Sequence, residues 1–201
     1  MKKILITGAT DGIGLETARK LKSLGHTVLI HGRNIEKLNK ISTELGVESF
    51  KADLSSLTET REFANLVLKT HKDIDVLINN AGIFKTSTPR TEDGFDVRFV
   101  VNTFSPFLLT KILLPNLKDG RVLNLSSAAQ SKVDFNAMLG KVELDDFEAY
   151  AQSKLAITMW SRQMALDLGV DESCIISVNP GSLLATNMVR EGFDIPGNDI
   201  N

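Results

Sequence analysis

Short β-branched apolar runs alternate with longer segments of helical periodicity along almost the whole chain, and this alternation strongly restricts the possible folds. The runs predict strands at 3–7, 27–31, 48–52, 74–79, 121–126 and 174–178. The segments between them predict helices at 13–24, 35–45, 57–70, 92–114 and 147–168. Strands that alternate with helices form a parallel sheet with both faces covered. The sequence therefore predicts an α/β fold: a Rossmann-type doubly wound parallel sheet in three layers, with helices on both faces.

The size and charge of the chain exclude several classes of protein. Its 201 residues, 42% of them hydrophobic, suffice for one sizeable core, and we expect residues 1–201 to form a single domain. With 23 basic and 25 acidic side chains the net charge is -2, which argues against a nucleic-acid partner. The one cysteine and three scattered histidines offer no zinc spacing, so no metal site is expected.

The location of the protein is predicted from what the sequence lacks. A lone cysteine suits a reducing cytoplasm. The first six residues begin like a signal peptide, but Thr7, Gly8 and Asp11 interrupt any apolar core of such a peptide. No later run of about 18 apolar residues follows. We therefore expect a cytoplasmic protein with no membrane span.

A glycine-rich turn follows the first predicted strand and opens a helix, in the run Thr7-Gly8-Ala9-Thr10-Asp11-Gly12-Ile13-Gly14. Glycines allow a sharp turn and a close approach of the backbone to a pyrophosphate, and the helix N-terminus presents free amides to it. The spacing differs from G-x-G-x-x-G and lacks the Lys-Ser/Thr ending of a triphosphate loop. The turn predicts dinucleotide binding, with an ordinary tight strand-to-helix connection as the alternative.

The end of the second strand bears on which dinucleotide is bound. An acidic residue about 20 positions beyond the glycines holds a ribose 2'-hydroxyl, whereas a basic residue accommodates a 2'-phosphate. Here the strand ends in His31-Gly32-Arg33-Asn34, with no carboxylate. The planar cationic fork of Arg33 suits a phosphate, although it could equally be a solvated surface charge. The sequence favours NADP(H) over NAD(H).

Tyr150, the only tyrosine, stands four residues before Lys154. On a helix this spacing places the phenol and the ammonium on one face. An adjacent cation favours phenolate and lowers a tyrosine pKa from about 10 toward the range useful for general acid–base catalysis. Because lysine is abundant in the chain, the pair alone is weak evidence.

Taken together, these motifs make the chain resemble the short-chain dehydrogenase/reductase family, of the classical type and similar to its retinol-dehydrogenase-like branch. The resemblance covers essentially the whole length. Its motifs occur in the family's order: Thr7-Gly8-x3-Gly12-x-Gly14, Asp53, Asn79-Asn80-Ala81-Gly82, Asn102, Ser127, Tyr150-x3-Lys154 and Asn179-Pro180-Gly181.

The resemblance implies an oxidoreductase that transfers a hydride between a nicotinamide cofactor and a small carbonyl or alcohol substrate. It implies that Tyr150 is the general acid or base, and that Lys154 lowers the Tyr150 pKa and hydrogen-bonds the nicotinamide ribose. Ser127 would hydrogen-bond the substrate oxygen, and Asn102 would hold a water that relays the proton. Ser126 competes with Ser127, but alternation along a strand points the two in opposite directions.

The resemblance also implies a set of cofactor-binding residues: Gly8, Thr10, Asp11, Gly12, Ile13, Gly14, Arg33, Asp53, Leu54, Asn80, Ala81, Gly82, Tyr150, Lys154, Pro180 and Gly181. Asn79 is expected to tie strands together more than Asn80 does. A homodimer or homotetramer is expected for the full-length protein. The alternatives are a non-catalytic NAD(P)-sensing binding protein of the same fold and, less well matched, a sugar-nucleotide epimerase.

Three departures from the family pattern stand out. The separation of Ser127 and Tyr150, 23 positions, is longer than usual, so we interpret 128–147 as a flap beside the substrate pocket or a surface excursion packed on itself. Thr186 falls one residue late for its contact with the nicotinamide. The C-terminal lid and a seventh strand are expected to be absent, so a chain ending at Asn201 should be poorly active and prone to aggregation.

Overall fold

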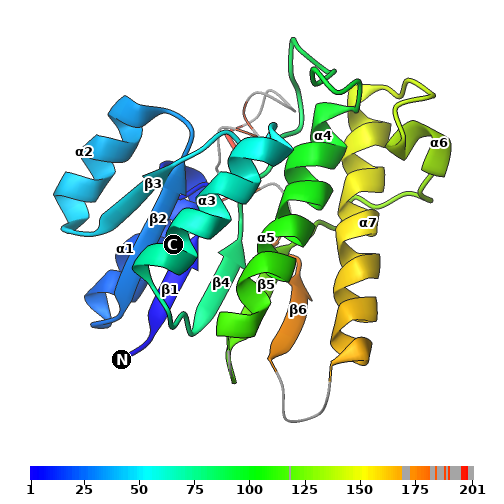
Figure 1. The fold of residues 1–201 in the computed structure, drawn as a ribbon. Coiled ribbons are helices and arrows are strands. Elements are labelled where there is room, and N and C mark those ends of the chain that lie inside the picture. Colours follow the sequence, from blue (N-terminus) through cyan, green and yellow to red (C-terminus); the bar gives the residue numbers. More distant parts are fainter. Residues whose placement is uncertain are drawn as a thin grey trace.

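The computed structural model describes residues 1–117, 119–168, 173–181, 184, 188, 190 and 196–198. Among these residues, six parallel strands form one sheet in the order β3-β2-β1-β4-β5-β6 (Figure 1). The strands are β1 Lys3–Ile6, β2 Thr27–Gly32, β3 Glu48–Lys51, β4 Val76–Asn79, β5 Arg121–Leu125 and β6 Cys174–Val178. The chain order reverses between β1 and β4, which lie side by side in the sheet. Such a reversal opens a crevice at the carboxyl ends of the strands, where open α/β sheets bind ligands.

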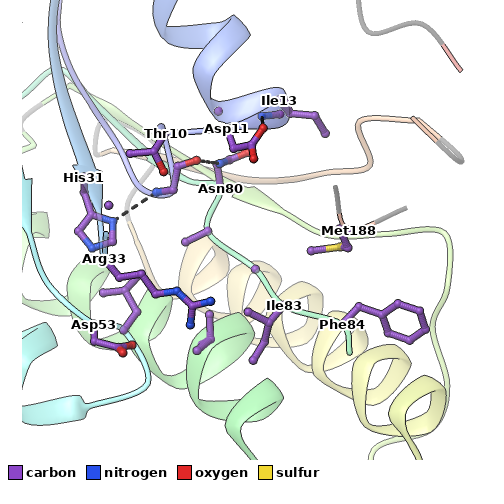
Figure 2. Close-up of a pocket in the computed structure, with 18 of the residues that line it drawn as sticks. Thr10, Asp11, Ile13, His31, Arg33, Asp53, Asn80, Ile83, Phe84 and Met188 are labelled. Carbon is purple, nitrogen blue, oxygen red and sulfur yellow. Dashed lines mark hydrogen bonds between the residues drawn. The ribbon is translucent and has the colours of Figure 1, made fainter. Parts of the chain in front are cut away.

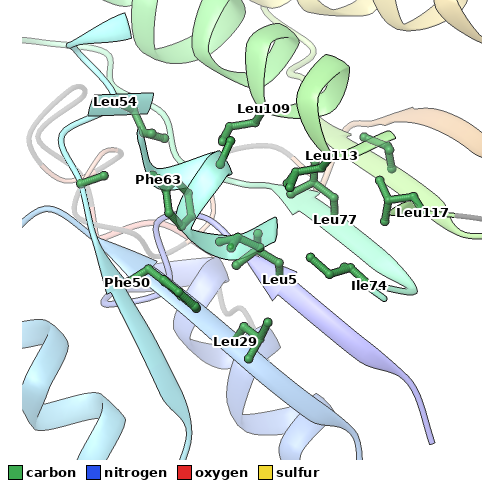
Figure 3. Packing of buried hydrophobic residues seen from close by; sticks show 14 of the residues in the cluster. Leu5, Leu29, Phe50, Leu54, Phe63, Ile74, Leu77, Leu109, Leu113 and Leu117 are labelled. Atoms are coloured by element: carbon green, nitrogen blue, oxygen red, sulfur yellow. The ribbon is translucent and has the colours of Figure 1, made fainter. Parts of the chain in front are cut away.

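Helices cover both faces of the sheet, as the sequence predicts. The helices α1 Gly12–Ser23 and α2 Ile35–Leu45 pack on one face, and α3 Leu57–Thr70, α5 Ser105–Leu113 and α7 Asp146–Asp167 pack on the other. The larger apolar cluster lies between the sheet and the second set of helices (Figure 3). Leu5, Leu77, Leu109 and Leu113 in this cluster are fully buried. This packing makes the strand ends a rigid support for the site.

One long helical run crosses the middle of the molecule and consists of α4 Val97–Phe99, η1 Val100–Phe104, α5 and η2 Leu114–Asn116. The predicted start at Glu92 is wrong, because Gly94 adopts a left-handed conformation with φ +83°. The chain also forms an antiparallel bridge between Arg90 and Asp96 there. The helix begins only after Asp96, whose side chain caps it by accepting from the Arg98 amide.

The same run, Val97–Asn116, is long and apolar enough by length and composition to cross a membrane. Most of it is buried against the rest of the fold, and the buried core helix of a soluble protein can have the same length and composition. The run therefore does not by itself indicate a membrane span. The expected lack of a membrane span stays a prediction.

Candidate active site

A cleft of about 380 Å³ opens at the carboxyl ends of the strands on either side of the β1–β4 switch point. Twelve of the predicted cofactor-binding residues line it: Gly8, Thr10, Asp11, Gly12, Ile13, Gly14, Arg33, Asp53, Leu54, Asn80, Ala81 and Gly82. Figure 2 shows Arg33 and Asp53 at one end of the cleft and Phe84 and Met188 at the other, with the glycine turn along one wall. The cleft is elongated in the way that a dinucleotide requires.

The glycine turn forms the wall because its backbone is packed too tightly for side chains. Gly8 has φ +65°, a conformation that favours glycine. A β-carbon on Gly14 would lie 2.3 Å from the carbonyl oxygen of Gly8 and 2.4 Å from Nδ2 of Asn80. Asp11 caps α1 by accepting from the Gly12 amide at 2.7 Å. The first residues of α1 line the cleft, and the N-terminus of a helix favours an anion.

The turn is held in place from β4. Asn80 donates from Nδ2 to the carbonyl oxygens of Thr7 and Gly8, at 2.9 and 3.0 Å. The Thr7 hydroxyl accepts from the backbone amides of Asn80 and Ala81. Asn79, the neighbouring residue, is buried and donates to Asn124 Oδ1 at 2.8 Å and to a threonine hydroxyl on α5. Asn79 ties strands together as predicted, and Asn80 has an equal structural task at the cleft itself.

Arg33 and Asp53 lie at one end of the cleft, at the carboxyl ends of β2 and β3 (Figure 2). The Arg33 side chain is exposed, and no described residue forms an ion pair with its guanidinium. Asp53 Oδ1 accepts from both the amide and the hydroxyl of Ser55, at 2.9 and 2.8 Å. A cation therefore stands at the end of β2, where NAD and NADP sites differ, and an oriented carboxylate stands next to it at the end of β3.

Tyr150, Ser127 and Lys154 come together beside this cleft, at the carboxyl end of β5. Tyr150 and Lys154 lie on α7, and the Ser127 hydroxyl lies near enough to the Tyr150 phenol to lower its pKa. The Tyr150 ring packs against the cleft residue Phe84, with ring centroids 5.1 Å apart. A β-carbon on Gly82, in the floor of the cleft, would lie 3.5 Å from Lys154 Nζ. The three side chains therefore border the end of the cleft marked by Phe84.

Burial dominates the electrostatics of this group. Burial raises the pKa of Tyr150, and the nearby Ser127 hydroxyl opposes the rise only in part. The expected lowering of the Tyr150 pKa by Lys154 is therefore wrong for this structure. The Lys154 ammonium lies 5.6 Å from the phenol ring centroid, and its own burial lowers its pKa to about 8. Tyr150 is accordingly a protonated phenol at neutral pH.

Asn102 lies inside the π-helical turn η1 and is almost fully buried. Its amide donates to the Ile83 carbonyl and to the Ser153 hydroxyl, both at 3.0 Å, and its oxygen accepts from the Ile83 amide at 2.9 Å. The side chain thus joins the chain after β4 to α7, with both amide hydrogens used and the oxygen accepting one bond. Single π-turns in helices are frequent at functional sites, which fits a position next to Lys154.

Ser126 and Ser127 point in different directions, as strand alternation predicts. The Ser126 hydroxyl is buried and bonds the Lys154 carbonyl oxygen at 3.0 Å and the Thr158 hydroxyl at 2.7 Å. The Ser127 hydroxyl instead lies on the side of Tyr150 and influences its pKa. Ser126 therefore holds β5 to α7, and the assignment of Ser127 to the site stays a prediction.

Four predicted cofactor residues are not in the cleft lining: Tyr150 and Lys154, which border its end, and Pro180 and Gly181. Pro180 and Gly181 follow β6 at the same edge of the sheet and are exposed. Thr186, whose contact with the nicotinamide was in doubt, lies outside the described residues.

Sequence reasoning missed part of the lining: His31, Gly32, Ala52, Ile83, Phe84, Lys85, Val101 and Met188. Ile83 to Lys85 directly follow the Asn80-Ala81-Gly82 run, and this position in the sequence could have indicated them. No sequence signal indicates His31, because it lies within a run that predicts an apolar strand.

The segment 128–147 lies along α7, as Figure 1 shows for its short helix α6 Phe135–Met138. Arg90 donates to the Gly140 carbonyl at 2.6 Å, and the Asp134 amide donates to Gln152 at 2.9 Å. The segment lines a second, apolar cavity of about 560 Å³ between α5 and α7, with Phe107 and Trp160. It does not line the cleft, so its role as a flap over a substrate stays a prediction.

The chain was compared with known proteins. The model of the short chain dehydrogenase family matches residues 2–194. Retinol dehydrogenase 12 of Mus musculus is 37% identical over 196 residues, which cover 92% of this chain and 62% of that protein. Retinol dehydrogenase 13 of Mus musculus is 34% identical over 193 residues, which cover 90% of this chain and 58% of that protein. The chain thus spans about three fifths of the length of these relatives.

The fold also resembles those of solved protein structures. An uncharacterized protein of Mycobacterium paratuberculosis superposes with a TM-score of 0.82 at 32% identity, covering 90% of this chain and 69% of that one. A short chain dehydrogenase of Burkholderia cenocepacia in complex with NADP superposes with a TM-score of 0.75 at 26% identity, covering 93% and 76% of the two chains.

Proposed function

Because this chain belongs to the short-chain dehydrogenase/reductase family and to its retinol-dehydrogenase-like branch, we propose that it transfers a hydride between NADP(H) and a carbonyl or alcohol substrate. The observation that carries the proposal is the cluster of Tyr150, Ser127 and Lys154 at one end of a cleft whose other end holds Arg33 and Asp53. An acid, a hydroxyl donor and a cation are thereby placed at the reacting end of a site shaped for a dinucleotide.

The residues of the cleft fit a nicotinamide dinucleotide. The turn packs closely against the chain after β4 at Gly8 and Gly14, where no side chain has room, and the start of α1 would provide amide donors to a pyrophosphate. Asp53 would accept from the adenine amine. The bound cofactor would supply or accept the hydride, and the protein would supply position and electrostatic stabilisation.

Tyr150 would act as the general acid when a carbonyl is reduced. Its raised pKa keeps the phenol protonated at neutral pH, which is the form that can donate a proton to a developing alkoxide. Ser127 lies near the phenol and would donate to the same substrate oxygen, stabilising its developing charge. Lys154 would compensate the phenolate left behind and would hold the nicotinamide ribose.

Asn102 would position this group and a relay water. Its bonds to Ile83 and Ser153 keep the π-helical turn in place beside Lys154. Because its amide oxygen can accept a second hydrogen bond, a relay water would bind to this oxygen or to backbone groups of the turn, and to Lys154.

The preference for NADP(H) rests on Arg33. Its guanidinium is exposed at the cleft end, and the second strand ends without a carboxylate to hold a 2'-hydroxyl. The solved short chain dehydrogenase of Burkholderia cenocepacia is in complex with NADP, which supports the same preference.

The proposed function is tested with a panel of aldehydes, ketones and secondary alcohols, with NADPH and NADH, on the wild type and on Tyr150→Phe. The variant keeps the ring contact with Phe84 and loses only the hydroxyl. We expect the rate to fall by about 10²-fold to 10⁴-fold with cofactor affinity unchanged. Equal activity in the variant would refute the role of Tyr150. Cofactor binding without turnover of any substrate would favour the NAD(P)-sensing alternative.

A further inference from the structure

His31 is a buried imidazole that lines the cofactor cleft but has no task in the proposed reaction. It is the penultimate residue of β2 and only 3% exposed. The strand lies between β1, which ends in the glycine turn, and β3, which ends next to Asp53. The side chain therefore stands between the two parts of the cleft that a dinucleotide has to bridge (Figure 2).

The ring makes one hydrogen bond to each part. The Gly8 amide donates to Nδ1 at 3.3 Å. Nε2 lies 3.1 Å from the carbonyl oxygen of Ala52. Because Nδ1 accepts and the carbonyl can only accept, the proton resides on Nε2, which donates to Ala52.

The surroundings hold the ring in this neutral form and in one orientation. Phe63 of α3 stacks on it, with ring centroids 4.7 Å apart and an interplanar angle of 27°. Burial lowers the pKa of His31 to about 4, although the Ala52 carbonyl and the nearby Asp53 act in the opposite direction. The Nδ1 lone pair is therefore available to the Gly8 amide throughout the neutral range.

The bond has a consequence for the turn. The Gly8 amide points at the imidazole, so it is not among the donors that can face a phosphate. The backbone bond from the Ala9 amide to the His31 carbonyl, 2.9 Å, adds a second link between the turn and β2. Together these bonds fix the position of the glycine turn relative to the ends of β2 and β3.

We propose that His31 is a positioning residue for the dinucleotide, whose neutral ring clamps the glycine turn to the end of β3 and so sets the span between the pyrophosphate-binding and adenine-binding parts of the cleft. The inference rests on the proposed function, since it presumes a dinucleotide in the cleft. A ligand that reaches both parts depends on the clamp. A ligand that reaches only one part does not.

The test compares two ligands by titration calorimetry: NADP⁺, which reaches both parts, and adenosine 2'-phosphate, which reaches Arg33 and Asp53 but not the turn. His31→Phe keeps the volume and the stacking on Phe63 and removes both hydrogen bonds. We expect it to weaken NADP⁺ binding by about 10-fold to 100-fold, as for a buried amide left unpaired. Binding of adenosine 2'-phosphate should change less than about threefold.

His31→Asn is the matched variant, because its side-chain oxygen can take the place of Nδ1 and accept from the Gly8 amide. We expect it to restore most of the NADP⁺ affinity and thus to separate the clamp from simple packing. If His31→Phe does not fold, the comparison of His31→Asn with His31→Gln, which keeps only the donor to Ala52, decides the matter. The ratio of the NADP⁺ dissociation constant to that of adenosine 2'-phosphate should rise in His31→Gln and should stay near the wild-type value in His31→Asn.

An unchanged ratio in every folded variant would overturn the inference and leave the proposed function intact. Equal weakening of both ligands would also overturn it, because that result indicates a general structural role. Failure of the wild type to bind either NADP⁺ or NAD⁺ would overturn the proposed function and this inference together.

Discussion

The ammonium of Lys154 donates to the carbonyl oxygen of Leu125, 2.7 Å away at the end of β5. The lysine side chain is 4% exposed, and its burial lowers its pKa from 10.5 to about 8. The bond anchors α7 to β5 next to Tyr150. The ammonium that forms this bond is desolvated, and its desolvation lowers the stability of the fold by an amount that depends on pH.

Lys154 should make the protein more stable as the pH rises above neutrality. Between the folded pKa and the unfolded pKa, the unfolded state binds more protons, so the free energy of unfolding increases with pH in this window. The rise is limited to about 3 kcal/mol, from about 1.4 kcal/mol for each pH unit. Urea unfolding of the wild type and of Lys154→Met, from about pH 7 to about pH 10, measures it. Parallel curves for the two proteins would contradict the prediction.

Ser127→Ala should lower the rate of carbonyl reduction by about 10²-fold to 10³-fold, because a donor to the developing alkoxide is lost. Ser126→Ala is the matched control. Its hydroxyl bonds α7 and not Tyr150, so we expect full activity and a loss of about 1 kcal/mol in stability. Steady-state kinetics and urea unfolding of both variants separate the two effects. Reversal of the two phenotypes would exchange the assignments of the serines.

Arg98 should contribute to stability through a buried ion pair at the start of α7. The side chain is 1% exposed, donates to Asp96 at 2.8 and 2.6 Å, and also pairs with Asp146. Arg98→Met removes a buried cation and leaves the carboxylate of Asp96, only 14% exposed, without its partner, so we expect a loss of about 3 kcal/mol in the free energy of unfolding.

The control for this prediction is Arg19→Met. Arg19 pairs with Glu16 and Glu44 on the surface, and the three side chains are 35–40% exposed. We expect a loss below about 1 kcal/mol, because solvent screens exposed pairs. Equal losses in the two variants, measured by urea unfolding, would show that the Arg98 pair is not worth more than a surface pair.

The fold was predictable because its signals are local. Each β-branched run became a strand within a few residues of the predicted ends, and the glycine that follows the second helix, Gly46, caps α2 with φ +58°. The predicted helix at 92–114 failed at its start, where Gly94 and the bridge from Arg90 to Asp96 override the apolar periodicity. A turn of this kind depends on a partner strand that the local pattern does not reveal.

The site was predictable where it depends on spacing and unpredictable where it depends on burial. The glycine turn and the run after β4 line one cleft because both follow neighbouring parallel strands. The direction of the Tyr150 pKa shift was wrong, because helical spacing brings Lys154 near without showing how deeply the phenol is buried. His31 was missed for a similar reason: its partners, Gly8 and Ala52, come from two other strands.

Arg33→Asp should exchange the cofactor preference. The substitution replaces a cation that can pair with a 2'-phosphate by a carboxylate that repels it and can accept from a 2'-hydroxyl. We expect kcat/KM with NADPH to fall by about 10-fold to 100-fold while that with NADH holds or rises. Arg61→Asp, an exposed position on α3 that does not line the cleft, is the control and should leave the ratio unchanged. An unaltered ratio in Arg33→Asp would remove the case for NADP(H).

Gly14→Ala should abolish cofactor binding, because the added methyl group meets atoms that cannot move away. It would lie 2.3 Å from the Gly8 carbonyl oxygen and 2.4 Å from Asn80 Nδ2, and these two groups are bonded to each other. The turn would have to separate from β4, at a cost of about 1 to 3 kcal/mol.

Gly46→Ala provides the comparison. Gly46 adopts φ +58° at the end of α2, so alanine there is strained by about 1 kcal/mol, but its β-carbon would meet nothing within 4 Å. Both variants should therefore lose stability in urea unfolding, and only Gly14→Ala should lose NADP⁺ affinity, by about 10-fold or more in calorimetric titration. Retained affinity in Gly14→Ala would mean that the cleft tolerates a displaced turn, and the close packing of the glycine turn against Asn80 would then not be what shapes the cofactor site.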